Sequence, residues 1–253
     1  MRRAAAALLL ALSACAGPVP AVPQPDGVPE VVVQVRSALQ AVAPPAPVVD
    51  RPQDLVSPNA VAHILRWEIT SRAYYNQQLR WPIWPGGASG VTWCIGYDGG
   101  HQTAPVIRRD WAEHASVDRL ATTAGITGTG AKAALPRYRD ISTPFDYCER
   151  IFREVTLPAY QRLAARTFAD GWEALPPDAQ GSLTATVYNR GSSMLGSRRD
   201  EMRMLRDVCV PARNLDCMAA QFRSMCRIWR GTINEGGLCG RYNDAARLVE
   251  RAK

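Results

Sequence analysis

Three side chains are of the types that cleave a glycosidic bond: Glu68, Thr92 and Asp98. Such cleavage needs two carboxyl groups, one that gives its proton to the leaving oxygen and one that is ionised and stabilises the transition state. Glu68 follows Ile64 by four residues on the apolar face of an expected helix, where burial favours the protonated acid. Asp98 would then orient water or stabilise charge, and Thr92 would position that water. The structural alternative for Glu68 is an ordinary half-buried glutamate near a helix end.

Thr92 and Asp98 lie in a glycine-rich stretch, GGASGVTWCIGYDGGH, at residues 86–101. The β-branched and aromatic residues at 91–97 between glycine clusters predict a short strand or a hairpin. Its glycines would let a sugar approach the backbone closely, and its aromatic rings would stack on sugars, with core packing as the alternative. The substrate-binding candidates in this stretch are Gly96, Tyr97 and His101.

Other motifs fail on their spacing. Residues 125–132 look like a phosphate loop, but Ala131 separates the last glycine from Lys132, so we expect a connecting loop. The three histidines have no zinc spacing, and no C-x-x-C pair occurs. We therefore expect neither a metal nor a cofactor.

The first residues read MRRAAAALLLALSAC and have the pattern of an export signal, with two arginines before a short apolar run. The run ends in Leu-Ser-Ala-Cys, which resembles the lipobox of bacterial lipoproteins. That resemblance implies a signal peptide at 1–14, lipidation of Cys15 and anchoring to the outer membrane on the periplasmic side. Cleavage as an ordinary secretory signal is the alternative. Residues 15–56 are rich in proline and would be a semi-rigid tether, with a short strand or helix within residues 30–43.

Export leads to an oxidising compartment, where an even number of cysteines indicates disulfides. Six remain beyond Cys15, enough for up to three bonds, although sequence alone allows 15 pairings. They are Cys94, Cys148, Cys209, Cys217, Cys226 and Cys239.

The working domain is expected at residues 57–253. Ser57-Pro58 is a helix start signal, and helical patterns follow the glycine-rich stretch at 110–121, 146–156, 158–172, 178–188, 200–208, 216–228 and 238–252. One small sheet in a mostly helical domain is an α+β architecture. The formal net charge of +7 favours an anionic partner such as a cell wall, but no dense block of basic residues indicates nucleic acid.

Several motifs together resemble the phage-type lysozymes and the related muramidase domain of the bacteriocin pesticin. These families have a helix-borne glutamate followed by a glycine-rich hairpin of the pattern T-x-G-Y-G-H, which corresponds here to Glu68 and residues 92–101. Residues 175–191 are similar to their central helix, which carries an Asn-x-Gly sequence, and residues 236–248 to their C-terminal element. The order Glu68, Thr92, Asp98 is the pesticin-like one, since no acidic residue lies between Glu68 and Thr92.

The resemblance implies a lysozyme-like fold, with a small β-hairpin lobe and a helical lobe, and a monomer that binds peptidoglycan. It also adds Asn189 to the substrate-binding candidates. The expected activity is hydrolysis of the bond between N-acetylmuramic acid and N-acetylglucosamine. A lytic transglycosylase and a non-catalytic peptidoglycan-binding lipoprotein are the alternatives.

Overall fold

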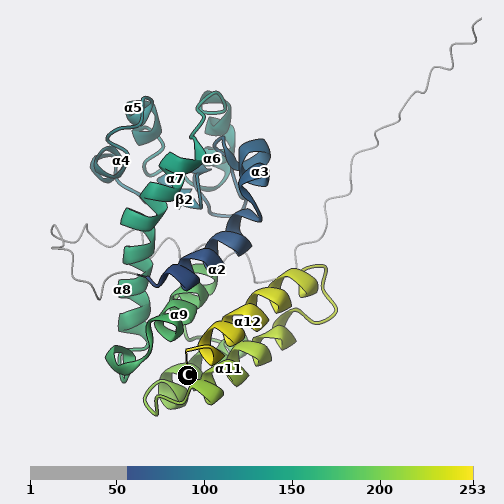
Figure 1. Cartoon of the computed structure of the whole chain (residues 1–253). Helices are drawn as coiled ribbons and strands as arrows, with labels where there is room; N and C mark the ends of the chain where they lie inside the picture. The colour runs from purple at the N-terminus through teal and green to yellow at the C-terminus, as the bar shows by residue number, and fades with distance from the viewer. Residues whose placement is uncertain (1–55, 253) are drawn as a thin grey trace, which may run out of the picture.

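A computed structural model describes residues 56–252, which are mostly helical and contain one two-stranded antiparallel sheet (Figure 1). This confirms the predicted α+β class. In Figure 1 the sheet and α3 to α6 gather at one end of the molecule, α11 and α12 lie at the other, and α2 runs between them. The predicted signal peptide, Cys15, the tether and the expected element at 30–43 lie outside the described residues.

The helices have these bounds: α2 Pro58–Ile69, α3 Arg72–Tyr74, α4 Ala104–Asp110, α5 Val117–Ala121, α6 Gly128–Ala134, α7 Phe145–Ile151, α8 Leu157–Thr167, α9 Pro177–Arg190, α10 Asp200–Met204, α11 Leu215–Ser224 and α12 Glu235–Glu250. Short 3-10 or π turns lie at Tyr75–Leu79, Gly99–His101, Leu135–Arg137, Phe152–Thr156, Trp172–Ala174, Ser197–Arg199, Leu205–Cys209 and Met225–Trp229. No helix among residues 56–252 combines the length and the apolar character needed to cross a membrane.

Helix α2, which carries Glu68, begins where its sequence signal predicts. The Ser57 hydroxyl accepts a hydrogen bond from the Ala60 amide, and Pro58 occupies the first turn. The same hydroxyl donates to Asp178 at 2.6 Å, which ties the start of α2 to the start of α9. Ala60, Val61 and Ile64 are buried, so the apolar face of α2 packs into the core as expected.

The predicted hairpin is confirmed as strands β1 (Thr92–Trp93) and β2 (Tyr97–Asp98), with Thr92 opposite Asp98 and Trp93 opposite Tyr97. A three-residue turn joins them. Gly96 has φ +76° there, a left-handed conformation that glycine adopts without strain.

The hairpin is attached to distant helices at three points. A disulfide joins Cys94 to Cys148 on α7. The Tyr188 hydroxyl on α9 donates to the Ile95 carbonyl at 2.6 Å, and the Tyr97 hydroxyl donates to Asp110 on α4 at 2.9 Å. These contacts fix the hairpin against the helices.

Two predictions about secondary structure are wrong. We expected a helix at 110–121, but Asp110 ends α4 and a separate α5 begins at Val117. The Asp110 carboxylate is buried and accepts from Tyr97 and Arg109, so it does not cap a new helix. Residues 125–132 are not a simple connecting loop, since α6 begins at Gly128. Strong helix formers follow this glycine in the sequence AKAA, and the buried side chains of Ala131 and Ala134 pack on the core.

The other predicted helices are observed, with ends shifted by a few residues or with a short turn completing them. The six cysteines form three disulfides, Cys94–Cys148, Cys209–Cys217 and Cys226–Cys239, which confirms the predicted number. The first one links the hairpin to the helices, whereas the other two join neighbouring elements in the C-terminal part.

Candidate active site

Glu68 lies in the last turn of α2, half-buried, with its side chain 17% exposed. Its Oε1 lies 2.7 Å from Nη1 of Arg241 on α12. The Arg241 side chain is only 6% exposed, so the two side chains meet largely out of water. Oε1 is nevertheless buried without a hydrogen bond of good geometry. Oε1 is therefore paired with Arg241 by distance but not by a well-aligned hydrogen bond.

Close packing of α12 against α2 brings Arg241 to Glu68. Gly240 leaves room for the Trp67 ring, because a Cβ on Gly240 would lie 2.6 Å from Trp67 Cη2. The indole nitrogen of Trp67 donates to Asp244 at 3.1 Å, one helical turn beyond Gly240. We did not predict that Arg241 pairs with Glu68, although the C-terminal motif that contains Arg241 was a usable signal.

His63 lies one turn before Trp67 on the same helix and is buried beside this ion pair. Burial, and then the charge of Arg241, lower its pKa from 6.5 to about 4. Its Nε2 is buried without a hydrogen-bond partner among the described residues. His63 is therefore neutral at pH 7, and Glu68 remains the acidic partner of Arg241.

The predicted residues Thr92 and Asp98 are brought together, and both contact Gly90. Each Asp98 carboxylate oxygen accepts from the Gly90 amide at 3.0 Å, and Oδ1 also accepts from the Gly100 amide. The Thr92 hydroxyl donates to the Gly90 carbonyl at 3.2 Å. Both side chains are nearly buried. These hydrogen bonds therefore fix the position of Gly90, just before strand β1.

The hairpin glycines are used for contacts within the protein. A Cβ on Gly90 would lie 2.4 Å from the Gly100 backbone, and one on Gly99 would lie 2.4 Å from the Trp93 ring. Protein atoms therefore fill the space beside Gly90, Gly99 and Gly100, where the sequence suggested that a sugar could approach the backbone. Gly96 is half-buried at the turn.

The remaining substrate-binding candidates differ in accessibility. Tyr97 is 6% exposed and stacks edge-on against Trp111, so its ring has no free face for a sugar. Nε2 of His101 lies 3.1 Å from the Ala88 carbonyl and 3.9 Å from Asp98 Oδ2. Asn189 is half-buried at the end of α9 and accepts from the Tyr242 hydroxyl at 2.8 Å.

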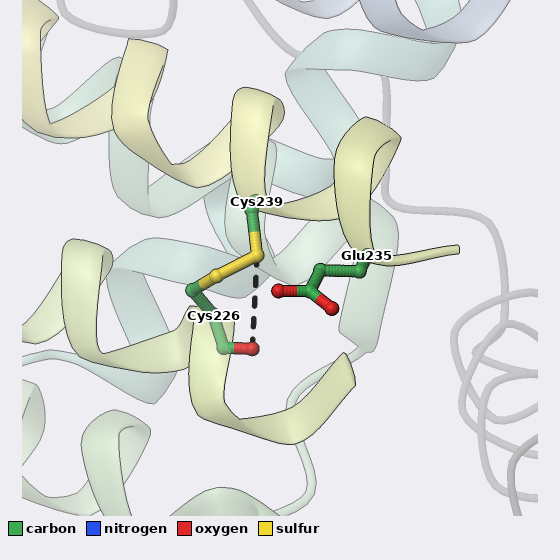
Figure 2. Close-up of side chains that lie close together, drawn as sticks. All are labelled: Cys226, Glu235 and Cys239. Carbon is green, nitrogen blue, oxygen red and sulfur yellow. Dashed lines mark hydrogen bonds between the residues drawn. A yellow bond between two sulfur atoms is a disulfide. The ribbon is translucent and has the colours of Figure 1, made fainter. Parts of the chain in front are cut away.

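One group of potential metal ligands occurs among the described residues, at Cys226, Glu235 and Cys239 (Figure 2). The two sulfurs are bonded to each other, so they are not thiolates. The dashed line in Figure 2 joins Cys239 Sγ to the Cys226 carbonyl at 3.7 Å, a contact without a proton in the oxidised state. The Glu235 carboxylate accepts from the Gly231 amide at 2.7 Å. With the disulfide formed, this group offers a metal only one carboxylate.

Two cavities among the described residues are lined by other side chains. A cavity of about 420 Å³ is lined by His114, Tyr147 and their neighbours, and a second of about 230 Å³ adjoins it beside Arg150. Neither includes Glu68, Thr92 or Asp98.

The sequence matches no protein-family model and no curated protein.

Proposed function

We propose that the protein hydrolyses peptidoglycan, with Glu68 as the general acid. The observation that carries this proposal is the half-buried Glu68 carboxylate, which has Oε1 without a well-formed hydrogen bond and a buried arginine beside it. A carboxyl group on a rigid helix, partly open to solvent, suits proton donation to a glycosidic oxygen. The resemblance of the surrounding motifs to phage-type lysozymes supports the choice of substrate.

Arg241 has two roles in this proposal. It holds the Glu68 side chain in one rotamer, because the ion pair joins two packed helices. It also places a positive charge 2.7 Å from the Glu68 oxygen where negative charge would develop during proton transfer.

Asp98 and Thr92 are the proposed second group. The Thr92 hydroxyl donates its proton to the Gly90 carbonyl, so its oxygen keeps the capacity to accept a hydrogen bond from a water molecule. Asp98 lies opposite Thr92 in the hairpin and adds a fixed negative charge on the same segment. That charge would stabilise a cation-like transition state.

The test is incubation of the purified protein with isolated sacculi, with reducing ends measured over time. We expect release by the wild type and a loss of about 10²- to 10⁴-fold in Glu68→Gln, the usual contribution of a general acid. Glu173→Gln is the matched control, since Glu173 is exposed on the same chain. A folded wild type that releases nothing, or a Glu68→Gln variant that loses nothing, contradicts the proposal.

Analysis of the products separates the alternatives. Reducing muramic acid ends indicate hydrolysis, whereas anhydro-muramyl ends indicate a lytic transglycosylase. Binding to sacculi without cleavage indicates a non-catalytic peptidoglycan-binding protein.

The proposed location is the periplasmic face of the outer membrane, through lipidated Cys15. Mass spectrometry of the mature N-terminus tests this, because a lipid-modified cysteine differs in mass from a peptide that begins at another residue. A Cys15→Ala variant that stays in the membrane fraction would contradict the anchor.

A further inference from the structure

Three arginines of the C-terminal part lie together without an acidic partner: Arg190, Arg198 and Arg199. Among the described residues no carboxylate oxygen lies within 4.0 Å of their guanidinium groups. Arg190 and Arg199 are each only 4% exposed. Buried charges are normally paired, because taking an unpaired charge out of water costs several kcal/mol.

The acceptors that these arginines do reach are neutral. Arg190 Nη2 donates to the Arg198 carbonyl, and Arg199 Nη2 donates to the Arg190 carbonyl. Arg199 Nη1 lies 3.2 Å from the sulfur of Met202, a weak acceptor. These bonds hold the side chains in position but leave their charge uncompensated.

Arg190 also has donors that are not used. Its Nε and Nη1 are buried and make no hydrogen bond of good geometry, although the Tyr242 hydroxyl lies beside the guanidinium. That hydroxyl donates to Asn189, and its oxygen can still accept from one Arg190 N–H. At least one buried N–H group of Arg190 is then left for a ligand with acceptor atoms.

An aromatic pair supports the cluster. Trp229 stacks on Tyr242, with centroids 5.3 Å apart and planes 12° apart. The guanidiniums of Arg190 and Arg198 lie 5.2 and 5.9 Å from the centroid of the Trp229 ring. Arg198 is exposed and Arg190 is buried, so a ligand from solvent meets Arg198 first.

The acidic residues nearby are already engaged. Glu201, buried within the same region, pairs with Arg227 and accepts from Ser224. Glu68 pairs with Arg241. Burial, and then the neighbouring charge of Arg190, lower the pKa of Arg199 to about 10, as mutual repulsion in the cluster requires.

We propose that Arg190, Arg198 and Arg199 form a binding site for an anionic oxygen group, a carboxylate or a phosphate. Planar guanidiniums with paired N–H groups match the geometry of both anions. Arg198 and Arg190 would donate to its oxygens, and the Trp229 ring, which both guanidiniums approach, would line the site. The identity of the anion rests on the proposed function. If the protein cleaves peptidoglycan, the anion is a carboxylate of the peptide that peptidoglycan carries on its muramic acid.

The first experiment uses inorganic phosphate alone and does not depend on the proposed function. Thermal unfolding of the purified protein is followed in phosphate and in chloride at equal ionic strength. Because a ligand of the folded state raises Tm as its concentration rises, we expect a saturable increase for the wild type. Arg198→Gln removes one charge-assisted contact, so half-saturation should need about tenfold more phosphate. Arg190→Met should abolish the increase.

One control variant, and one variant that can replace Arg190→Met, make this result specific. Arg166→Gln on α8 removes the same charge at an exposed position outside the cluster and should behave as the wild type. Arg198→Gln carries the test if Arg190→Met does not fold, because the Arg198 side chain is exposed and its guanidinium lies against the indole face. The proposal is overturned if phosphate fails to raise Tm, or if all variants respond alike.

The second experiment distinguishes the source of the anion. Intact sacculi are compared with glycan strands whose peptides have been removed by an amidase. If cleavage is half-saturated at a lower concentration of intact sacculi than of peptide-free glycan, and Arg198→Gln loses this difference, the ligand is the peptide carboxylate. If the wild type needs the same concentration of both substrates, the site binds free phosphate. If neither substrate is cleaved while phosphate still raises Tm, the proposed function fails and the anion site stands.

Discussion

Replacement of His63 by glutamine should make the protein less sensitive to acid. The His63 imidazole takes up a proton near pH 6.5 when the chain is unfolded, but only near pH 4 when it is buried beside Arg241 in the folded protein. Between these values the unfolded state binds more protons, so lowering the pH favours unfolding. Stability from this group is complete above about pH 6.5 and is lost as the pH falls towards 4.

The magnitude follows from the two pKa values. A pKa of about 4 in the folded state against 6.5 in the unfolded state costs about 2 kcal/mol of unfolding free energy at pH 5 and about 0.2 kcal/mol at pH 7. Glutamine does not titrate in this range, so His63→Gln should not show this loss. His114, whose pKa burial also lowers, contributes equally in both proteins and cancels in the comparison.

Urea denaturation at pH 7 and pH 5, followed by tryptophan fluorescence, measures the effect. We expect the wild type to lose about 2 kcal/mol more than His63→Gln between the two pH values. An equal loss in both proteins would show that His63 does not resist protonation in the folded state, and the reasoning about the α2–α12 interface would be refuted.

Three further predictions concern stability. Gly90→Ala should destabilise the protein by several kcal/mol, because the new Cβ would lie 2.4 Å from the facing Gly100 backbone. The control Gly236→Ala has open space around it and should be neutral or stabilising by up to about 1 kcal/mol. An equal fall of Tm in both variants would contradict this prediction. Asp98→Asn places an amide donor against backbone N–H groups and should cost about 1–3 kcal/mol in urea denaturation. The Cys94–Cys148 disulfide closes a loop of 54 residues, and Cys209–Cys217 closes one of 8. If disulfides stabilise by limiting the entropy of the unfolded chain, replacing both cysteines should cost about 4 kcal/mol for the first and about 2.5 kcal/mol for the second. A larger fall of Tm on loss of Cys209–Cys217 would rule out this explanation.

The parts of the fold that depend on neighbouring residues could be predicted from the sequence. Ser57 and Pro58 start α2 because a hydroxyl cap and a fixed φ act within one turn. Thr92 faces Asp98 because a short hairpin pairs residues that are close in sequence. Both features are local. Residue types and spacing were sufficient for the helix start and for a strand or hairpin, whereas the pairing of Thr92 with Asp98 was seen only in the structure.

Features that depend on distant partners could not be predicted in this way. Asp110 resembles a helix cap but is taken by the Tyr97 hydroxyl on another element. The even number of cysteines indicated three disulfides, yet only the packing of α7 against the hairpin selects Cys148 for Cys94. Similarly, Glu68 meets Arg241 only because Gly240 lets two helices approach closely.

The hydrogen bond from Tyr188 to the Ile95 carbonyl has a consequence for the order of folding. The two residues are 93 positions apart, and the bond is buried. The hairpin turn cannot gain this support until α9 has been synthesised and has docked, and contacts between such distant residues slow folding because the long intervening loop must close first. We therefore expect the hairpin to be among the last elements to become protected from hydrogen exchange, even though its residues are made early.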